Sequence, residues 1–290
     1  MSAAKDQRKG YFAGRAVRNG QLIYSSVSQV VLFDALQEGC PRKWAYPYVF
    51  GIKLKKTDAQ VAGSDEYAQK LEHYLKSGED VLPPVLQEAK KFIPMWGPDL
   101  EVEKPLAVTG PNEKGVVVPG GGLLTAIKLR EAYLETGDFG YSAEIKKWAG
   151  LTAAGVPLEG AADYRHMRGE YLDEEGVLQK ELPGTIVCET VDLKTTSRID
   201  PHRVLRGVNA GTILPGRAKT AAQVCAHPQM LGYGVYIADR ESSLTHVRLA
   251  HVYAQTSSKK SAKRMGLLSV EEVRRRWREA LRQFAKVDLH

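Results

Sequence analysis

The chain has 290 residues, of which 43% are hydrophobic and 26% are charged, and this composition excludes a disordered or low-complexity chain. A chain of this length can bury a substantial core within one large domain or two small ones. Lys and Arg outnumber Asp and Glu by 41 to 34, and the net charge of +7 permits a polyanionic partner without requiring one.

Cysteine usage and apolar runs bear on where the protein works. Cys40, Cys188 and Cys225 lie far apart and form no Cys-x-x-Cys pair, which disfavours a disulfide scaffold and a four-cysteine metal site. No apolar run approaches the roughly 18 residues that span a membrane, and residues 1–10 lack the apolar stretch of a secretory signal. We therefore expect a cytoplasmic protein with no membrane partner.

The first third of the chain is predicted to hold a hairpin followed by helices. Asn19-Gly20 lies between two short runs in residues 11–24, a pattern typical of a two-residue hairpin turn. A cluster of serines beginning at Ser25 offers N-caps for a helix that ends near Cys40. Further helices are predicted over residues 64–76 and 84–92.

Later in the chain, strands alternate with helices. Residues 157–167 and 185–194 are predicted strands joined by an acidic connection, and we expect them to pair antiparallel. The remaining predictions are strands over 116–118 and 246–255, helices over 124–135, 142–148 and 217–238, and a basic helix over 270–284 with Val273, Trp277, Leu281 and Phe284 on one face. Strands mixed with helices indicate an α/β or α+β layer fold.

Two patterns resemble functional motifs without completing them. Gly211 and Gly216 have the glycine spacing of a P-loop, but Arg217-Ala218 stands where Lys-Ser/Thr must follow, so no nucleotide cofactor is expected. His246 and His251 lie on a predicted strand at an odd spacing, which points them to opposite faces and excludes joint metal ligation.

One group of charged residues is placed for chemistry. The apolar segment that begins at Thr185 ends with Asp192 and Lys194, and strand geometry puts these two side chains on one face. Asp163, in the sequence Gly-Ala-Ala-Asp, lies on the expected partner strand. Two carboxylates beside a lysine form a hard-oxygen site suited to Mg²⁺ or Mn²⁺. Spacing alone leaves open a plain cross-strand salt bridge with solvated charges.

Four segments, in chain order, add to this pattern. They are SSVSQVVLFDALQEGCPRKWAYPYVFGIK from Ser25, AGSDEYAQKLEHYLKSGE from Ala62, the strands GAAD and ETVDLKTTS, and HPQMLGYGVYIAD from His227 to Asp239. Together they resemble the PD-(D/E)XK nuclease superfamily, in its RecB-like and CRISPR-associated exonuclease branch. The resemblance implies an α/β fold with a restriction-endonuclease-like core, in which a central mixed β-sheet is flanked by helices and the N-terminal portion is helical.

The resemblance also implies roles for individual residues. Asp163 and Asp192 would ligate the metal, with the main-chain carbonyl of Leu193 as a further oxygen ligand. Lys194 would orient and polarise the attacking water. Glu103 resembles the acidic position that precedes the metal aspartate in the family, and an exposed edge charge is the alternative for it.

On the helix that follows, Gln229 and Tyr233 match the Gln-x-x-x-Tyr motif of this branch and would steady the active site or a substrate phosphate. The chain departs from the family near Tyr67, where a helical His is expected. Either Glu66 or Glu72 substitutes for it, or the second metal position is absent.

A second departure concerns iron–sulfur chemistry. Cys40 stands at the early cluster position of the CRISPR-associated relatives, but no cysteine follows Cys225, so no iron–sulfur cluster is expected. We divide the chain into an N-terminal hairpin and tail (1–24), a nuclease domain (25–255) with an insertion of unknown role at about 110–150, and a basic C-terminal helix (256–290).

These observations predict a metal-dependent DNA nuclease, most specifically a RecB-like exonuclease that acts on DNA ends. The alternatives are a catalytically inactive nucleic-acid-binding protein on a nuclease scaffold and a restriction-type endonuclease, and the oligomeric state stays open. Basic side chains placed for a DNA partner are Arg42, Lys43, Lys53, Lys55 and Lys56, interleaved with Trp44, Tyr46 and Tyr48, and Arg274, Arg275, Arg276, Arg278 and Arg282.

Overall fold

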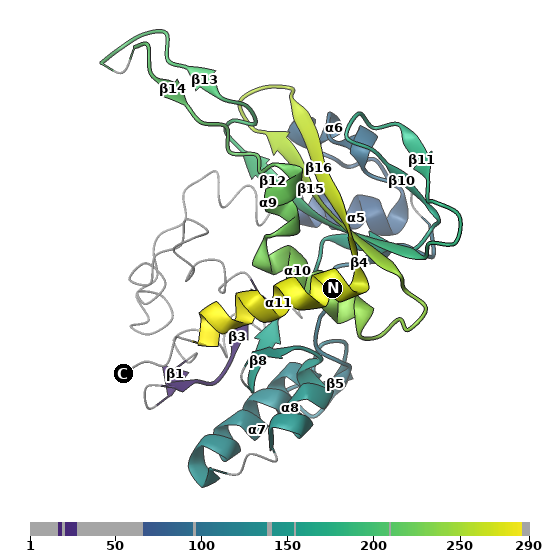
Figure 1. Cartoon of the computed structure of the whole chain (residues 1–290), viewed down its shortest axis with the longest axis vertical. Coiled ribbons are helices and arrows are strands. Elements are labelled where there is room, and N and C mark those ends of the chain that lie inside the picture. The colour runs from purple at the N-terminus through teal and green to yellow at the C-terminus, as the bar shows by residue number, and fades with distance from the viewer. Residues whose placement is uncertain are drawn as a thin grey trace.

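The structure is a computed structural model that describes residues 17–18, 21–27, 66–94, 97–137, 141–153, 155–208 and 210–285. Cys40 and the aromatic-basic stretch that follows it lie outside the described residues, as does most of the helix predicted before them. Figure 1 shows a central sheet with helices on its two sides, a helical lobe below it and a hairpin that projects from one end.

The central sheet has five strands in the order β16-β15-β12-β9-β4. The long strands β12 and β15 are parallel, with Asp192 opposite His251, and the other neighbouring pairs are antiparallel. This arrangement confirms the predicted α/β fold with a central mixed sheet flanked by helices. The strand bounds are β4 (Glu101–Val102), β9 (Tyr164–His166), β12 (Val187–Thr196), β15 (His246–Gln255) and β16 (Ser261–Ser269).

Alternate side chains of β12 point into two separate hydrophobic clusters, one on each face of the sheet. Cys188 belongs to the cluster that contains the helices α9 (Ala221–Cys225), α10 (Pro228–Ala238) and α11 (Val270–Ala285). Val191 belongs to the cluster on the opposite face, which contains α5 (Ala68–Ser77), α6 (Pro84–Gln87) and the short 3-10 helix η3 (Lys90–Phe92). The sheet is therefore the middle of three layers.

Helix ends follow local chemistry. Thr220 begins α9 with a capping box, because its side chain accepts from the Gln223 N–H while the Gln223 side chain accepts from the Thr220 N–H. Pro228 occupies the first turn of α10, where a backbone N–H would have no acceptor within the helix, so its absence costs no hydrogen bond. In α11, Val273 and Trp277 are buried one helical turn apart and attach the helix to α10.

The segment predicted as an insertion forms the lobe at the bottom of Figure 1. Its helices α7 (Gly122–Thr136) and α8 (Tyr141–Ala149) contact each other through Ala126, Ile145 and Ala149. The insertion also contains β5 (Gly110–Pro111) and β6 (Val117–Val118). A small sheet outside it has the strand order β3 (Ser25–Ser26), β8 (Val156–Glu159) and β7 (Thr152–Ala153).

Three hairpins lie outside these sheets. The strands β1 (Val17–Arg18) and β2 (Gln21–Leu22) pair antiparallel around the predicted turn. The acidic connection contains β10 (Glu170–Leu172) and β11 (Leu178–Lys180), which the sequence did not predict. The strands β13 (His202–Arg203) and β14 (Ile213–Leu214) form the hairpin that projects from the end of β12.

Four predictions need correction. The single strand predicted over 157–167 is two strands in different sheets, β8 and β9, because residues 160–163 form a loop in which Gly160 O accepts from the Leu106 N–H at 2.8 Å. The helix predicted over 217–238 is interrupted before Pro228, and the one over 84–92 is interrupted after Gln87. The C-terminal segment 256–290 is more than a basic helix, since it contributes β16 to the central sheet.

None of the helices in the described ranges is long and apolar enough to cross a membrane.

Candidate active site

The candidate site lies on the face of the sheet that α10 covers. Asp192 and Lys194 project from β12 toward the N-terminal turns of α10, which carry Gln229 and Tyr233. Asp163 lies immediately before β9, on the other side of β12 from β15. The structure therefore brings together the five side chains that the sequence singled out from three separate segments.

Asp192 and Lys194 form an ion pair, with 2.5 Å between Nζ and Oδ2. Asp192 is buried, whereas 37% of the Lys194 side chain is exposed, so the lysine reaches from the carboxylate toward solvent. This contact confirms the prediction that the two side chains lie on one face of the strand. Their catalytic role stays a prediction.

Gln229 connects the helix to both charged groups. Its Oε1 accepts a hydrogen bond from Lys194 Nζ at 3.3 Å, and its Nε2 lies 3.4 Å from Asp192 Oδ1. The same Nε2 donates to the Tyr233 hydroxyl at 2.8 Å. Burial, followed by the Asp192 charge, raises the pKa of Tyr233 well above its usual value, so the phenol stays neutral. A neutral amide held by a neutral phenol positions the Asp192–Lys194 pair without adding charge.

Asp163 is held by the backbone beside it, because the Leu193 N–H donates to Asp163 Oδ2. Burial, followed by the charge of Asp192, raises the pKa of Asp163 well above its usual value, although the Leu193 N–H and Lys194 lower it. The charge of Asp192 therefore disfavours the ionised form of Asp163. Such a pair is stabilised by any cation placed between its oxygens.

Lys194 already supplies part of that positive charge. Burial lowers the pKa of Lys194, but the charge and hydrogen bond of Asp192 and the charge of Asp163 outweigh burial, and the net shift is upward. The side chain is therefore an ammonium at neutral pH. It can donate a hydrogen bond or a proton, and it cannot take one up.

The donor atoms fit a hard divalent cation. Asp192 Oδ2 is buried and carries the ion pair with Lys194 Nζ, so a cation bound at this oxygen would share it with the lysine. Carboxylate and main-chain carbonyl oxygens are the ligands that Mg²⁺ and Mn²⁺ prefer. The described residues contain no cluster of three or more His, Cys, Asp or Glu side chains that could hold a metal by themselves. The Leu193 carbonyl and water would have to complete the ligand set.

Glu103 lies next to this site through its backbone. Its N–H donates to the main-chain carbonyl of Asp163 at 3.1 Å, and its charge contributes to raising the pKa of the Asp163 carboxyl. Its backbone is left-handed, with φ of 51°, directly after β4. The structure places Glu103 beside the pair without showing that it ligates a metal.

The substitutes considered for the family's helical His are elsewhere. Glu66 pairs with Lys70 and Glu72 pairs with Lys76 on the exposed side of α5. That helix covers the face of the sheet opposite to the Asp192 side chain. Neither glutamate therefore substitutes for the missing His.

Two histidines to which the sequence assigns no role at this site, His227 and His251, lie behind Asp192. His251 Nε2 is 3.7 Å from Asp192 Oδ2, and its Nδ1 is 2.9 Å from the Tyr253 hydroxyl. The ring of His227 meets the ring of His251 edge to face, with centroids 5.3 Å apart. Burial lowers the pKa of each histidine to about 3, and nearby positive charges add to the effect. Only the register of β12 against β15 places His251 here, and no local pattern in the sequence shows that register.

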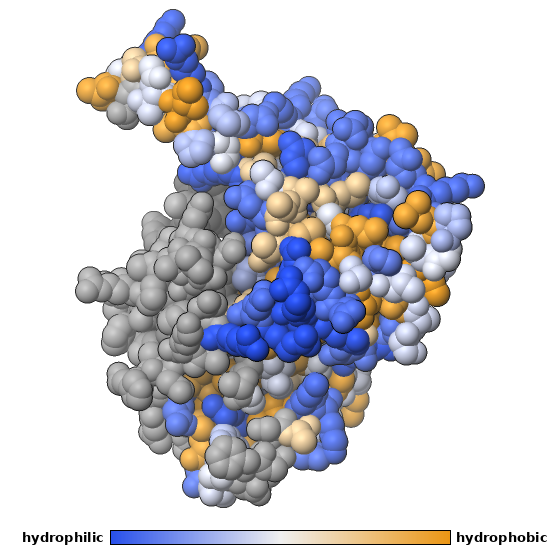
Figure 2. All heavy atoms as spheres, viewed as in Figure 1, coloured by the Kyte–Doolittle hydropathy of each residue, from blue (hydrophilic) through white to orange (hydrophobic). Residues whose placement is uncertain are grey.

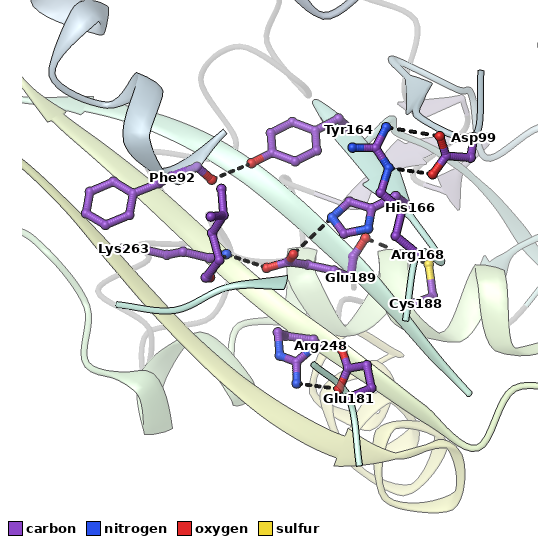
Figure 3. A network of polar contacts seen from close by, with 11 residues as sticks. Phe92, Asp99, Tyr164, His166, Arg168, Glu181, Cys188, Glu189, Arg248 and Lys263 are labelled. Carbon is purple, nitrogen blue, oxygen red and sulfur yellow. Dashed lines mark hydrogen bonds and ion pairs between the residues drawn. The ribbon is translucent and has the colours of Figure 1, made fainter. Parts of the chain in front are cut away.

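A second buried polar cluster lies on the opposite face of β12 (Figure 3). Lys263 Nζ is 2.5 Å from Glu189 Oε1, and His166 Nε2 is 3.0 Å from Glu189 Oε2. Lys263 also donates to the carbonyl of Leu172. Burial raises the pKa of Glu189, but His166 and Lys263 outweigh it and lower the pKa overall. This cluster joins β9, β12 and β16.

Comparisons with known proteins add little to this geometry. No family model matches the chain, and no curated protein matches it. Among solved structures, the chain is similar to one described as "Putative exonuclease" from Eubacterium rectale, with 13% identity and a TM-score of 0.38. The match covers 96% of this chain and 84% of that chain. A likeness this distant assigns neither a family nor an activity.

Proposed function

We propose that the protein is a metal-dependent nuclease that hydrolyses phosphodiester bonds in DNA, in the manner of a RecB-like exonuclease acting on ends. The observation that carries the proposal is the convergence of Asp163, Asp192 and Lys194, with Gln229 of α10 accepting a hydrogen bond from the lysine. A salt bridge alone explains the contact of Asp192 with Lys194. It does not explain why a second buried carboxylate is held against the first.

The residues have separable tasks in this mechanism. Asp163 and Asp192, with the Leu193 carbonyl, would hold Mg²⁺ or Mn²⁺. When bound, the ion supplies positive charge to the scissile phosphate and the leaving oxygen. Lys194 donates a hydrogen bond to the attacking water and polarises it, and its raised pKa keeps it in the donating form. Gln229 fixes the position of the Lys194 ammonium.

Surface charge supports a DNA partner only in part. Arg274, Arg275 and Arg276 of α11 are engaged by Asp239, Glu272 and Glu279. Arg278 and Arg282 form no ion pair with the described residues, and Figure 2 shows the hydrophilic surface of α11 facing solvent. The proposed DNA-binding surface thus draws on fewer free charges than the sequence indicates.

The proposal is tested by incubating the protein with end-labelled linear duplex, circular duplex and single-stranded DNA in Mg²⁺, Mn²⁺ or EDTA. We expect short products from linear DNA in either metal, slow or no cutting of circular DNA, and no products in EDTA. Discrete fragments from circular DNA would instead favour a restriction-type endonuclease. DNA binding without cleavage in either metal would favour the inactive scaffold and contradict the proposal.

A further inference from the structure

A hairpin continues directly from the strand that bears the candidate site. β12 ends at Thr196, and the chain then runs out and back through β13 and β14, in which Arg203 is opposite Ile213. We call residues 198–208 and 210–217 the arm. Figure 1 shows the arm projecting beyond the end of the central sheet, away from the body of the protein.

The base of the arm is attached to the strand next to the site. The Ile199 N–H donates to Gln255 Oε1 at 3.0 Å, and Ile199 is buried against Tyr253. On the return, the Lys219 N–H donates to the Tyr253 hydroxyl at 2.9 Å. Tyr253 is the register partner of Lys194 on the parallel strand. The arm is therefore anchored on the residue beside the candidate catalytic lysine, and it begins at Arg198, four residues or roughly 13 Å of extended chain after Lys194.

The tip of the arm is apolar and fully exposed. Leu205 and Val208 are 78% and 107% exposed, and Figure 2 shows hydrophobic side chains on the projecting hairpin. The loop that carries them is closed by Val204, whose N–H donates to the carbonyl of Thr212 at 2.9 Å. Gly211, with φ of 90°, allows the chain to reverse. An exposed apolar tip, with nothing packed against Leu205 and Val208 among the described residues, is typical of a contact surface.

The charge of the arm selects the kind of partner. Its four arginines, Arg198, Arg203, Arg206 and Arg217, form no ion pair within the described ranges, while its one acidic residue, Asp200, is neutralised by Lys260. Four positive charges against one negative charge leave the arm at +3. Apolar side chains flanked by arginines are the combination with which proteins enter and unstack base steps of DNA, since the arginines hold phosphates while the apolar groups replace stacking.

We propose that the arm separates the strands of duplex DNA in front of the candidate site. Leu205 and Val208 insert between bases at the junction of paired and unpaired DNA, and Arg203 and Arg206 hold the phosphates on either side. Leu205 lies seven positions after Arg198, so an extended chain carries the tip roughly 23 Å from the base of the arm, or about seven nucleotide steps. One strand then reaches Lys194 unpaired. This inference rests on the proposed nuclease function.

The test measures unpairing and cleavage separately. A duplex with 2-aminopurine near its end reports unpairing when it is bound by the cleavage-impaired Lys194→Ala protein. The arm variant carries Leu205→Ser and Val208→Ser. The matched control carries Val177→Ser and Leu178→Ser, at residues that are 55% and 58% exposed on the β10–β11 hairpin. All four positions are exposed, so neither variant disturbs the core.

We expect the arm variant to bind single-stranded DNA as the parent does and to lose most of the fluorescence rise on the duplex. In the active protein, duplex cleavage should fall about tenfold or more relative to single-strand cleavage, because unstacking a base step is no longer compensated. The control variant should match the parent in both measurements.

The outcomes distinguish this inference from the proposed function. An arm variant with unchanged unpairing and an unchanged ratio of duplex to single-strand cleavage overturns strand separation and leaves the nuclease proposal intact. Equal loss of binding to both DNA forms, or a change of oligomeric state in light scattering, also overturns it, because the arm would then be a general DNA contact or an interface between copies. A parent that unpairs the duplex end but cuts no DNA supports the arm and overturns the nuclease function.

Discussion

At the scale of single residues, the candidate site is a balance of charges. Asp163 and Asp192 lie close enough that the pKa of Asp163 is raised, first by burial and then by its neighbour, while the Lys194 ammonium offsets part of the repulsion. A metal ion must displace the proton that a raised pKa keeps on Asp163. Metal affinity should therefore increase as pH rises through the pKa of that carboxyl.

Because His227 and His251 are buried and neutral behind Asp192, we expect the folded protein to lose stability in acid. Their folded pKa values of about 3 lie below the value of about 6.5 expected in the unfolded chain. Between these values the unfolded state binds protons that the folded state does not, so the free energy of unfolding decreases as pH falls. Each histidine contributes up to about 1.4 kcal/mol per pH unit to this slope. The free energy of unfolding of His251→Gln or His227→Gln should therefore decrease less steeply in acid than that of the parent.

Urea unfolding of the parent and each variant at several values between about pH 5 and pH 7 measures this difference. The comparison with the parent is needed because Glu189, whose pKa is lowered, also loses stabilisation in acid, whereas Asp163, whose pKa is raised, acts with the opposite sign. Parallel pH profiles for parent and variants would contradict neutral buried histidines.

Gln229 is predicted to act through the residues that it positions. Gln229→Ala removes the hydrogen bond to Lys194 Nζ, and a displaced ammonium should lower the cleavage rate constant by about tenfold to a hundredfold. Tyr233→Phe removes a hydroxyl that contacts Gln229 and should cost less. Single-turnover cleavage at saturating protein separates this loss of rate from weaker DNA binding. A larger loss for Tyr233→Phe than for Gln229→Ala would contradict this order of action.

At the scale of elements, the Glu189 cluster holds three strands together on the face away from the site (Figure 3). Lys263→Met should reduce the free energy of unfolding by about 3–5 kcal/mol, because it leaves a buried carboxylate without its ammonium. Combining it with Glu189→Leu should restore most of the loss, and the double variant should cut DNA as the parent does.

Thermal or urea unfolding gives the stability of the parent, the single variant and the double variant. The control is Lys260→Met, which breaks an exposed ion pair with Asp200 and should change the free energy of unfolding by less than about 1 kcal/mol. If Lys263→Met were as stable as Lys260→Met, the buried pair would not be holding the strands.

Local patterns account for part of this structure. The strand predicted over 246–255 coincides with β15, and the spacing of Asp192 from Lys194 and of Gln229 from Tyr233 places each pair on a common face. These are relations within one element, which strand and helix periods determine.

Relations between elements were not predictable in the same way. β16 was missed because Lys263 is typical of a surface segment, and its burial depends on Glu189, which is distant in the sequence. The sequence excludes a P-loop at Gly211 and Gly216 but does not predict that β14 lies between them, because its partner β13 is not recognisable from a local pattern. Whether such a segment forms a strand depends on the strand with which it pairs, and a single sequence does not identify that partner.

At the scale of the whole molecule, a net charge of +7 predicts that DNA affinity is dominated by phosphate contacts. Binding of the Lys194→Ala protein to an end-labelled duplex should weaken steeply as salt is raised from low to physiological concentration, with log affinity falling linearly against log salt. Fluorescence anisotropy over that range measures the slope. A DNA affinity that does not change with salt concentration would contradict a nucleic-acid substrate.

The most direct test of the site joins metal binding, cleavage and stability in one substitution. Asp192→Asn should lose Mn²⁺ binding in calorimetry and DNA cleavage together, while its thermal melt without metal stays close to that of the parent. The matched control is Asp80→Asn, which makes the same chemical change in an exposed carboxylate paired with Lys90 at 2.8 Å. The control should bind metal and cut DNA normally. If Asp192→Asn binds Mn²⁺ or cuts DNA at a rate near that of the parent, the site has been assigned to the wrong residues.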